Sequence, residues 1–315
     1  MLSSIFRNIL QHLSFFYKND MSNAKKKDKR IYKKLAHYQI KNLKNIENLK
    51  STHNKFNKQI YLILKKGRLY NFLRNSFIQK MFFVHNRYFI YNELRTLKKN
   101  QNWNFYKKLL IEDNIGNPIR YFLYPKSSGN RINHVYHLSL LEKLLEIKLK
   151  NINYIFEFGG GYGCMARIFF KINKKVRYSI FDTPLVNLLQ FYYLKQNSMN
   201  VGFNKNSQFV LNNKLTNIKS IKRINSLFIA NWSLSETPIF YRNKFLKYIQ
   251  NHHYILIAFQ EYFEEINNRE YFYKLKKILS KNYEITIFEN KFYKGNIFKK
   301  QKHYFFVGKK IKNDF

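Results

Sequence analysis

The sequence predicts an α/β fold: a mostly parallel sheet with an antiparallel hairpin at its edge, preceded by an all-helical region. Two observations support this prediction. After residue 150, short β-rich runs alternate with helical stretches, which is typical of parallel sheets. Before residue 110, basic helical patterns follow one another and contain a single glycine, Gly67. With 315 residues, of which 45% are apolar, the chain can bury a substantial core.

Residues 1–110 are predicted to form a basic helical N-terminal region. They hold 25 basic and 4 acidic residues, a net charge of 25 − 4 = +21, whereas residues 111–315 hold 33 and 14 and carry +19. A further amphipathic stretch at 2–16 indicates a surface helix, with an interfacial membrane helix as the alternative. Apolar stripes at helical spacing predict helices at 24–49, 56–66, 70–83 and 87–99.

The composition bounds the partners and the location. A formal charge of +40 normally indicates nucleic acid or anionic membranes as partners. However, the chain is rich in Lys, Asn, Ile, Phe and Tyr and poor in Gly and Pro, a bias that codon usage in an A/T-rich genome produces. We therefore expect no specific nucleic-acid partner. The single cysteine, Cys164, excludes an internal disulfide and favours a reducing compartment, so a cytoplasmic location is expected.

A domain boundary is predicted near residues 110 to 120, so that residues 111–315 form the second domain. Loop-forming residues concentrate at 114–118 and 125–130, and an apolar helix follows at 135–149. Strands that alternate with helices favour parallel pairing, whereas the last two runs favour an antiparallel hairpin. The predicted strands are 154–158, 177–181, 226–230, 254–259, 283–288 and 303–307.

A glycine-rich turn follows the first predicted strand. Such a turn lets a nucleotide-like ligand approach the backbone, and the helix predicted at 165–171 presents free N–H groups to it. Asp182 ends the second strand, where an acid can accept hydrogen bonds from both ribose hydroxyls. The last glycine of the dinucleotide pattern G-x-G-x-x-G is missing, which argues against hydride chemistry. The turn contains four of the ten glycines: Gly159, Gly160, Gly161 and Gly163.

Several motifs together resemble one enzyme family. The run IFEFGGGYG, residues 155–163, resembles the E/D-x-G-x-G-x-G motif of class I S-adenosylmethionine-dependent methyltransferases. Four further motifs are Gly116-Asn117-Pro118, Asp182-Thr183-Pro184, Leu189-Gln190-Phe191-Tyr192-Tyr193-Leu194 and Ser233-Leu234-Ser235-Glu236. With these motifs, the chain resembles the sugar O-methyltransferase family over residues 85–310.

The resemblance implies a Rossmann-like class I methyltransferase sheet and S-adenosyl-L-methionine as cofactor. It also implies that the methyl acceptor is a sugar hydroxyl, on a nucleotide-sugar or a surface-glycan precursor. The residues that it implies for cofactor binding are Glu157, Gly159, Gly160, Gly161, Gly163 and Asp182.

Acidic residues at the ends of successive β-runs predict where the chemistry occurs. Glu157, Asp182, Glu236 and Glu261 lie at or just beyond four strand ends and should line one rim. A sugar hydroxyl is a poor nucleophile and benefits from a general base. Glu236 is the first candidate for this base, with helix capping as its alternative role.

Histidines provide the second candidate base. His303 opens the last β-run, whereas the other histidines of this region carry a weaker signal: His134, His137, His252 and His253. We expect no metal centre, because no Cys/His cluster with metal-ligand spacing occurs. A divalent ion between Glu236 and Glu261 stays open.

Three functions compete at this point. The first is methylation of a sugar hydroxyl, with a sugar or nucleotide-sugar as partner and membrane contact through the 2–16 helix as an option. The second is a nucleic-acid (RNA) methyltransferase whose basic N-terminal region holds phosphates; against it, residues 230–233 lack the D-P-P-Y type of motif that stacks a flipped base. The third is a non-catalytic glycan-assembly or membrane-surface adaptor. No oligomeric state is predicted.

Overall fold

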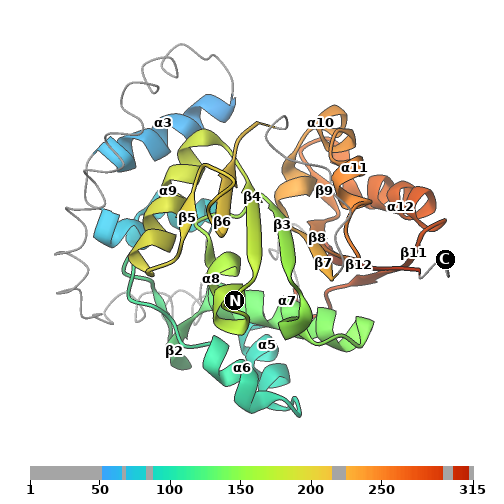
Figure 1. The fold of residues 1–315 in the computed structure, drawn as a ribbon, viewed down its shortest axis with the longest axis horizontal. Coiled ribbons are helices and arrows are strands. Elements are labelled where there is room, and N and C mark those ends of the chain that lie inside the picture. Colours follow the sequence, from blue (N-terminus) through green and yellow to red (C-terminus); the bar gives the residue numbers. More distant parts are fainter. Residues whose placement is uncertain (1–51, 66–68, 83–87, 215–224, 294–300, 312–315) are drawn as a thin grey trace, which may run out of the picture. The chain divides into compact units, whose positions relative to one another are not determined.

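The computed structural model describes residues 52–65, 69–82, 88–214, 225–293 and 301–311 (Figure 1). The helices predicted at 2–16 and 24–49 lie outside these residues. The chain divides into two compact units that interleave along the sequence. The first unit comprises residues 1–136, 161–168 and 183–207, and the second comprises residues 137–160, 169–182 and 208–315. The boundary near residues 110 to 120 stays a prediction.

The described N-terminal part of the first unit is helical, as predicted. The helix expected at 70–83 is divided into a 3₁₀ turn, η2, and the α-helix α4. Asn71 within the turn has non-helical angles of φ −121° and ψ 18°. Asn75 Oδ1 then accepts a hydrogen bond of 2.9 Å from the backbone N–H of Phe77, which caps the restarted helix. The elements are α3 (Thr52–Lys65), η2 (Leu69–Arg74), α4 (Ser76–Phe82), α5 (Tyr88–Lys98) and α6 (Trp103–Leu109).

The first unit continues with a small antiparallel hairpin, β1 (Arg120–Tyr121) and β2 (Tyr124–Ser128), in a region where no strand was predicted. The helix expected at 135–149 begins earlier and ends earlier, as α7 (Gly129–Leu145). Residue 136 of this helix is the last of the first unit here, and the second unit continues from residue 137 through the rest of α7 and a separate 3₁₀ turn, η3 (Leu149–Asn151). The first unit also contains the first half of α8 (Cys164–Ile172), all of α9 (Pro184–Gln196) and the short strand β5 (Val201–Gly202).

A buried ion network ties the start of α8 to the segment before β1. Arg131 Nη2 lies 2.7 Å from Glu112 Oε1 and 2.9 Å from Asp113 Oδ2. Arg167, on the first turns of α8, binds the Asp113 carboxylate through both Nε (3.0 Å) and Nη2 (2.8 Å). Two guanidinium groups and two carboxylates thus neutralise one another in the interior, and the bidentate pair fixes the orientation of α8.

The second unit contains a mostly parallel sheet with an antiparallel hairpin at its edge. Its strands follow the order β11-β12-β8-β7-β3-β4-β6, in which β8, β7, β3, β4 and β6 are parallel and β12 runs antiparallel to both β8 and β11. This confirms the predicted Rossmann-like sheet. The strands are β3 (Tyr154–Phe158), β4 (Arg177–Phe181), β6 (Phe209–Asn212), β7 (Ser226–Asn231), β8 (Tyr254–Gln260), β11 (Tyr283–Glu289) and β12 (His303–Lys310).

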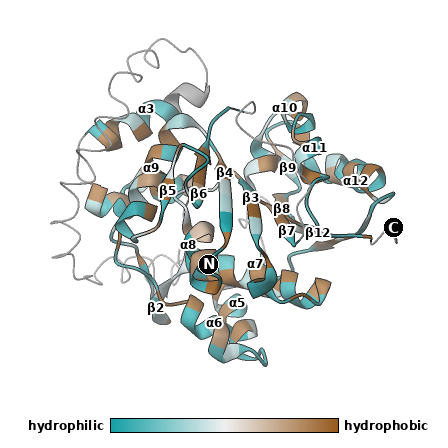
Figure 2. Cartoon of the chain, viewed as in Figure 1, coloured by the Kyte–Doolittle hydropathy of each residue, from teal (hydrophilic) through white to brown (hydrophobic). Residues whose placement is uncertain are grey.

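All six predicted strands begin at their predicted residues, but β6 was not predicted. A four-residue strand is too short to produce a periodic signal of its own. The small antiparallel hairpin of β9 (Tyr262–Phe263) and β10 (Ile266–Asn267) was missed for the same reason. The central strands β7 and β8 consist almost entirely of buried apolar residues, as expected for parallel strands covered on both faces (Figure 2).

Aromatic side chains join one face of this sheet to three helices of the same unit, α10 (Ile239–Asn243), α11 (Leu246–Ile249) and α12 (Asn268–Leu279), which lie together in Figure 1. The Phe245 ring lies 4.5 Å from that of Phe158 and 4.9 Å from that of Phe181, the last residues of β3 and β4. The Phe259 and Phe272 rings stack at 4.1 Å. This packing fixes the segment after β7 against the carboxyl ends of the strands. Within the described residues, no helix has the length and apolar character to cross a membrane.

Candidate functional site

The glycine turn after β3 uses backbone angles that favour glycine. Gly159, Gly161 and Gly163 have φ of +70°, +54° and +97°, in the left-handed region. The Gly159 N–H donates a 2.8 Å hydrogen bond to the carbonyl of Phe181, which continues the pairing of β3 with β4. A Cβ on Gly159 would lie 2.2 Å from the Cβ of Ser233. Packing against the loop after β7 therefore requires glycine at position 159.

Gly161 is different, because protein packing leaves room for a side chain there. A Cβ on Gly161 would come no closer than 3.4 Å to its nearest neighbour, an atom of the Phe82 ring. Its carbonyl accepts a 2.9 Å hydrogen bond from Gln190 Nε2, which holds the turn in place. Gly163 accepts the first helical hydrogen bond of α8, from the N–H of Arg167. Gly160 is buried, and its φ is not positive.

Glu157 lies inside the sheet rather than on its rim. Its side chain is buried, and the hydroxyl of Tyr178 donates a 2.8 Å hydrogen bond to Oε2. Burial raises the pKa of the Glu157 carboxyl to about 8, and the nearby charge of Asp182 acts in the same direction, while the Tyr178 hydrogen bond opposes both. Glu157 therefore holds a proton at neutral pH in the absence of a positive charge nearby.

Asp182 stands where the sequence placed it, directly after β4. In the sheet register Phe158 pairs with Phe181, so the glycine turn and Asp182 follow two neighbouring parallel strands at the same level. The Asp182 N–H donates a 2.9 Å hydrogen bond to the carbonyl of Asn212, the last residue of β6. The half-buried carboxylate beside a glycine turn is an arrangement suited to accepting hydrogen bonds from vicinal hydroxyls.

The loop after β7 begins with a strained tryptophan. Trp232 has φ +61° and ψ −32°, a conformation that bulky residues rarely adopt and that needs surrounding contacts to persist. Its backbone N–H donates a 2.7 Å hydrogen bond to Ala258, and its indole Nε1–H donates a 2.9 Å hydrogen bond to His303 Nδ1. Its ring also lies 5.5 Å from that of His137. These contacts hold Trp232 against β8 and β12.

Arg242 holds the rest of this loop, and sequence reasoning missed it. The loop continues as the 3₁₀ turn η5 (Ser233–Glu236). The buried guanidinium of Arg242 donates hydrogen bonds to the carbonyls of Ser235 (2.6 Å) and Thr237 (2.5 Å) and to Asn268 Oδ1 (2.7 Å). Because the two carbonyls flank Glu236, one side chain fixes the backbone on both sides of that carboxylate.

Glu236 is exposed at the end of this loop. Gln260 Nε2 approaches its Oε1 at 3.4 Å, and Ser235 Oγ lies 2.7 Å from Gln260 Oε1, which orients the amide. Desolvation by neighbouring protein atoms raises the pKa of the Glu236 carboxyl to about 6, while the Gln260 hydrogen bond opposes this effect. Helix α10 begins with Pro238 at its N-cap and no side-chain cap, so Glu236 does not cap it.

His303 lies next to Gln260, because the two residues pair in the register of β12 and β8. Its Nδ1 accepts the hydrogen bond from the Trp232 indole, which can only donate. In the neutral ring the proton therefore lies on Nε2, an assignment made from the hydrogen-bond partner. The Tyr293 ring lies 3.5 Å from the imidazole. Because Nδ1 already accepts the Trp232 hydrogen bond, the neutral His303 ring can offer a ligand only the donor Nε2–H.

The other predicted acid, Glu261, and the remaining histidines have contacts of their own in the structure. Glu261 follows β8, with Arg269 Nη1 at 3.8 Å from its carboxylate. Burial lowers the pKa of His137 to about 4, while the contact of its Nδ1 with Asn231 Oδ1, at 3.1 Å, opposes this effect. His252 is buried with Nδ1 2.6 Å from the carbonyl of Tyr248, in a structural position. Two further histidines lie on α7 and before β8: His134 and His253.

Three of the four predicted acids follow the carboxyl ends of parallel strands, and Glu157 does not, because it precedes the end of β3 and points into the interior. In the described part of the chain, no group of three or more His, Cys, Asp or Glu side chains is arranged to hold a metal ion.

No protein-family model and no curated protein matches the chain. Solved structures to which it is similar include phosphoethanolamine N-methyltransferase 2 of Haemonchus contortus, in complex with phosphomonomethylethanolamine and S-adenosylhomocysteine (11% identity, 71% of this chain and 60% of that chain, TM-score 0.41). Others are the Thermoplasma acidophilum protein 1320 (11%, 73% and 100%, TM-score 0.39) and TYW2 of M. jannaschii in complex with AdoMet (15%, 56% and 76%, TM-score 0.36). Likeness at this level assigns neither an activity nor a ligand to this chain.

Proposed function

We propose that the chain is a cytoplasmic S-adenosylmethionine-dependent methyltransferase that acts on a sugar hydroxyl, on a nucleotide-sugar or a surface-glycan precursor. One observation carries the cofactor part of the proposal. A turn with three glycines at positive φ and the carboxylate of Asp182 follow two neighbouring parallel strands of a Rossmann-like sheet. The sugar acceptor is supported by the motif resemblance, which includes the Ser233–Glu236 loop.

The residues present suit this cofactor. When bound, S-adenosylmethionine supplies an electrophilic methyl group on a positively charged sulfur. The backbone of the turn from Gly159 to Gly163, including Gly160, would lie against the ligand, and Asp182 would accept hydrogen bonds from the ribose hydroxyls. The Glu157 carboxyl, whose pKa is raised to about 8, would lose its proton more readily once a positive charge lies near the turn.

Glu236 is the proposed general base. Above a pH of about 6 its carboxylate is ionised and can take the proton of an acceptor hydroxyl, directly or through one water. Arg242 holds the backbone on both sides of this carboxylate, so the position of the base does not depend on its own side-chain contacts alone. His303, with its proton on Nε2, is proposed to donate a hydrogen bond to the acceptor.

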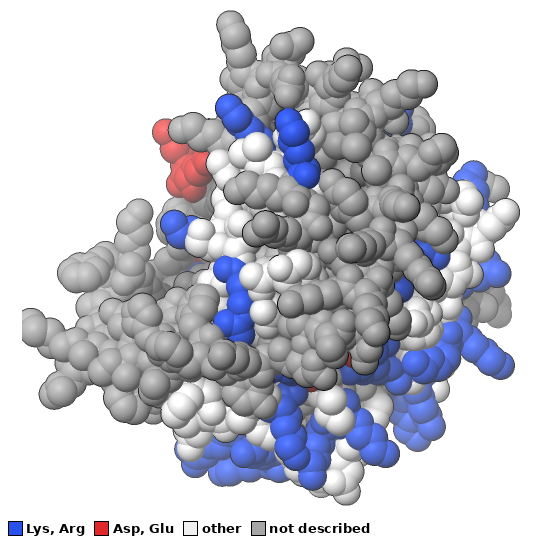
Figure 3. All heavy atoms as spheres, turned by 90° about the vertical axis from the view of Figure 1, so that its left-hand side faces the viewer, with Lys and Arg blue, Asp and Glu red and all other residues white. Residues whose placement is uncertain are grey.

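The alternative of an RNA methyltransferase rests on the basic charge of the chain. Figure 3 shows Lys and Arg side chains on one face, most densely toward its lower edge, with few acidic side chains among the described residues. The formal charge of the whole chain is +40, so basic side chains on one face do not by themselves indicate a nucleic-acid site. We therefore retain the sugar acceptor and make RNA an arm of the test.

The test begins with calorimetry of S-adenosylhomocysteine binding to the wild type and to Gly161→Val. A side chain at 161 has room in the protein but lies on the proposed path of the ligand, so the variant should lose binding. Because Gly161 has φ +54°, the melting temperature of Gly161→Val is measured as well, so that a loss of binding is separated from a loss of folding. Gly202→Ala, outside the turn, controls for the replacement of a glycine elsewhere, where the new Cβ meets only the Ser207 side chain. Wild-type affinity in Gly161→Val would contradict the cofactor site. Transfer of labelled methyl from S-adenosylmethionine to a panel of nucleotide-sugars, glycan precursors and RNA then identifies the acceptor.

A further inference from the structure

The segment that follows the candidate base presents a small apolar surface to solvent. Pro238, Ile239 and Phe240 are consecutive exposed residues, and Ile239 and Phe240 are 44% and 68% exposed. Phe240 is the most exposed of the large apolar side chains among the described residues. The segment itself is firmly anchored, because Arg242 and Phe245 are buried beneath it. These side chains are therefore held outward by a fixed backbone.

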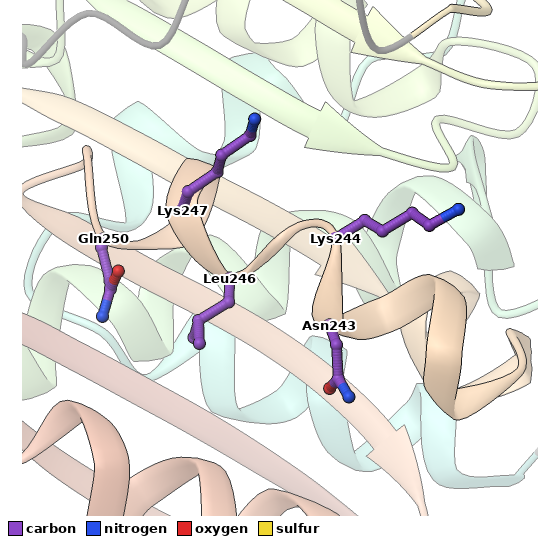
Figure 4. A pocket seen from close by; sticks show the side chains of 5 residues that line it. All are labelled: Asn243, Lys244, Leu246, Lys247 and Gln250. Atoms are coloured by element: carbon purple, nitrogen blue, oxygen red, sulfur yellow. The ribbon is translucent and has the colours of Figure 1, made fainter.

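Two lysines stand beside this apolar surface. Lys244 and Lys247 are exposed, and Lys244 Nζ lies 5.7 Å from the ring centroids of both Phe240 and Tyr241, which places its ammonium group next to the exposed ring. The two lysine side chains extend to the same side of the segment, whereas those of Asn243, Leu246 and Gln250 point to the other side (Figure 4). These five residues line an open hollow of about 470 Å³. The sequence contains no acidic residue from 237 to 260.

We propose that residues 238–247 form a docking surface for a lipid bilayer that contains anionic lipid. An aromatic ring and an isoleucine at the tip would enter the boundary between head groups and acyl chains, as in interfacial anchors. Lysines behind them would keep their ammonium groups at the level of the lipid phosphates, with their stems along apolar surface. Residues 237–260 themselves carry no acidic side chain that would repel anionic lipid, and the exposed Glu236 borders this stretch.

Other occupants fit this surface less well. Single-stranded RNA binds through rows of cations and stacked aromatic rings, but Pro238 and Ile239 offer no aromatic face and the surface has only two exposed lysines. A second copy of the chain would need to bury about 800 Å² on each partner, which is more than three exposed apolar side chains provide. A bilayer requires neither a long row of cations nor a large complementary surface.

The position of this surface connects it with the proposed reaction. Glu236 precedes Pro238 by two residues, and the same Arg242 that lies under the docking segment holds the carbonyls on both sides of Glu236. A bilayer bound at residues 238–247 would therefore lie next to the proposed base. Together with the proposed function, on which this step rests, the geometry favours an acceptor sugar carried on a lipid-linked glycan precursor.

The test is co-sedimentation of the full chain with vesicles of phosphatidylcholine and phosphatidylserine (60:40) at physiological salt. The variant Ile239→Ser with Phe240→Ser should lower the vesicle partition constant about tenfold, because two apolar side chains no longer enter the bilayer. The matched control is Ile278→Ser on α12, a side chain that is 53% exposed and should leave the partition constant unchanged. Melting temperatures of all variants should remain near that of the wild type, since the substituted side chains are exposed.

The charge arm uses a second pair of variants, because the whole chain is basic. Lys244→Gln with Lys247→Gln should lower the partition constant by at least tenfold, given about fivefold for each lysine near an anionic surface. Lys277→Gln with Lys281→Gln removes the same charge from exposed positions elsewhere and should have a small effect.

Equal losses in both lysine pairs, or wild-type partition in the apolar variant, would overturn the docking surface. Loss of RNA affinity in the apolar variant, with vesicle binding intact, would overturn it in favour of nucleic acid. Binding of S-adenosylhomocysteine, measured on the same variants, should stay unchanged, so failure of this inference is distinguishable from failure of the cofactor site.

Discussion

Glu157→Gln tests whether an acid of the motif is buried in its protonated form. The pKa of the Glu157 carboxyl is raised from 4.5 to about 8, and burial is the main cause. At about 1.4 kcal/mol per pH unit, this difference corresponds to about 5 kcal/mol of stability that the wild type loses between acid and alkaline pH. Between pH 4.5 and about 8, Glu157 holds a proton in the folded state and releases it in the unfolded state. Stability therefore falls as pH rises through this window.

The assay is urea unfolding of the wild type and Glu157→Gln at half-unit steps from pH 5.5 to 8.5. Every other titrating group is common to both proteins, so the difference between their free energies of unfolding isolates residue 157. The variant, whose amide does not titrate and can still accept the Tyr178 hydrogen bond, should gain about 3 kcal/mol relative to the wild type across this range.

Tyr178→Phe is the paired variant, because it removes the donor that favours the ionised carboxylate. It should move the pH window of Glu157 upward. A difference between wild type and Glu157→Gln that does not change with pH would refute the account of a desolvated carboxyl under the glycine turn.

Four further predictions follow from the site. Gly159→Ala should destabilise the fold by at least about 2 kcal/mol in thermal unfolding, because the new Cβ meets Ser233 Cβ at a positive φ, and Ser233→Gly in the same chain should recover part of the loss. Asp182→Ala should weaken S-adenosylhomocysteine binding by about 1.5–3 kcal/mol in calorimetry. A loss of only a few tenths of a kcal/mol would show that other residues bind the ribose. Wild-type kcat should rise with pH through about 6, as the Glu236 carboxylate ionises, and Glu236→Gln should lower kcat by roughly 10²–10⁴ with unchanged cofactor affinity. If His303→Ala loses turnover while Glu236→Gln retains it, Glu236 is not the base and the contribution of His303 is the larger one. Arg242→Lys should lower kcat up to about 10²-fold without weakening S-adenosylhomocysteine binding, because a lysine cannot donate to both flanking carbonyls and Asn268 at once. Normal turnover in this variant would show that the loop keeps its conformation without the Arg242 hydrogen bonds.

Patterns among neighbouring residues predicted most strands of the sheet, but they did not predict the short elements. Runs such as Tyr154–Phe158 and Arg177–Phe181 begin where the sequence predicts, because their apolar stretches are bounded by polar residues that end the strand pattern. The strand Phe209–Asn212 carries too few residues for such a signal, and it exists because it pairs with β4. The break in the helix expected at 70–83 depends on one asparagine cap, which outweighs the apolar stripe on either side of it.

The amino-acid sequence by itself determined the α/β fold, the helical character of the described N-terminal part and the place of the glycine turn. Each depends on residues close together in the chain: periodic apolar positions, or glycines where φ must be positive. It also placed Asp182 beside the turn, because consecutive parallel strands joined by a helix commonly pair with each other.

Only the tertiary structure decided what surrounds the candidate catalytic residues. Trp232 and His303 are 71 residues apart, and Arg242 and Asn268 are 26 apart, yet the hydrogen bonds within each pair set a tautomer and hold a loop. Glu157 is acidic in the motif, but burial among the strands around it raises the pKa of its carboxyl, against the opposing effect of the Tyr178 hydrogen bond. Partners of this kind leave no periodic trace in a sequence, since the contacts form only when strands distant along the chain pair in one sheet.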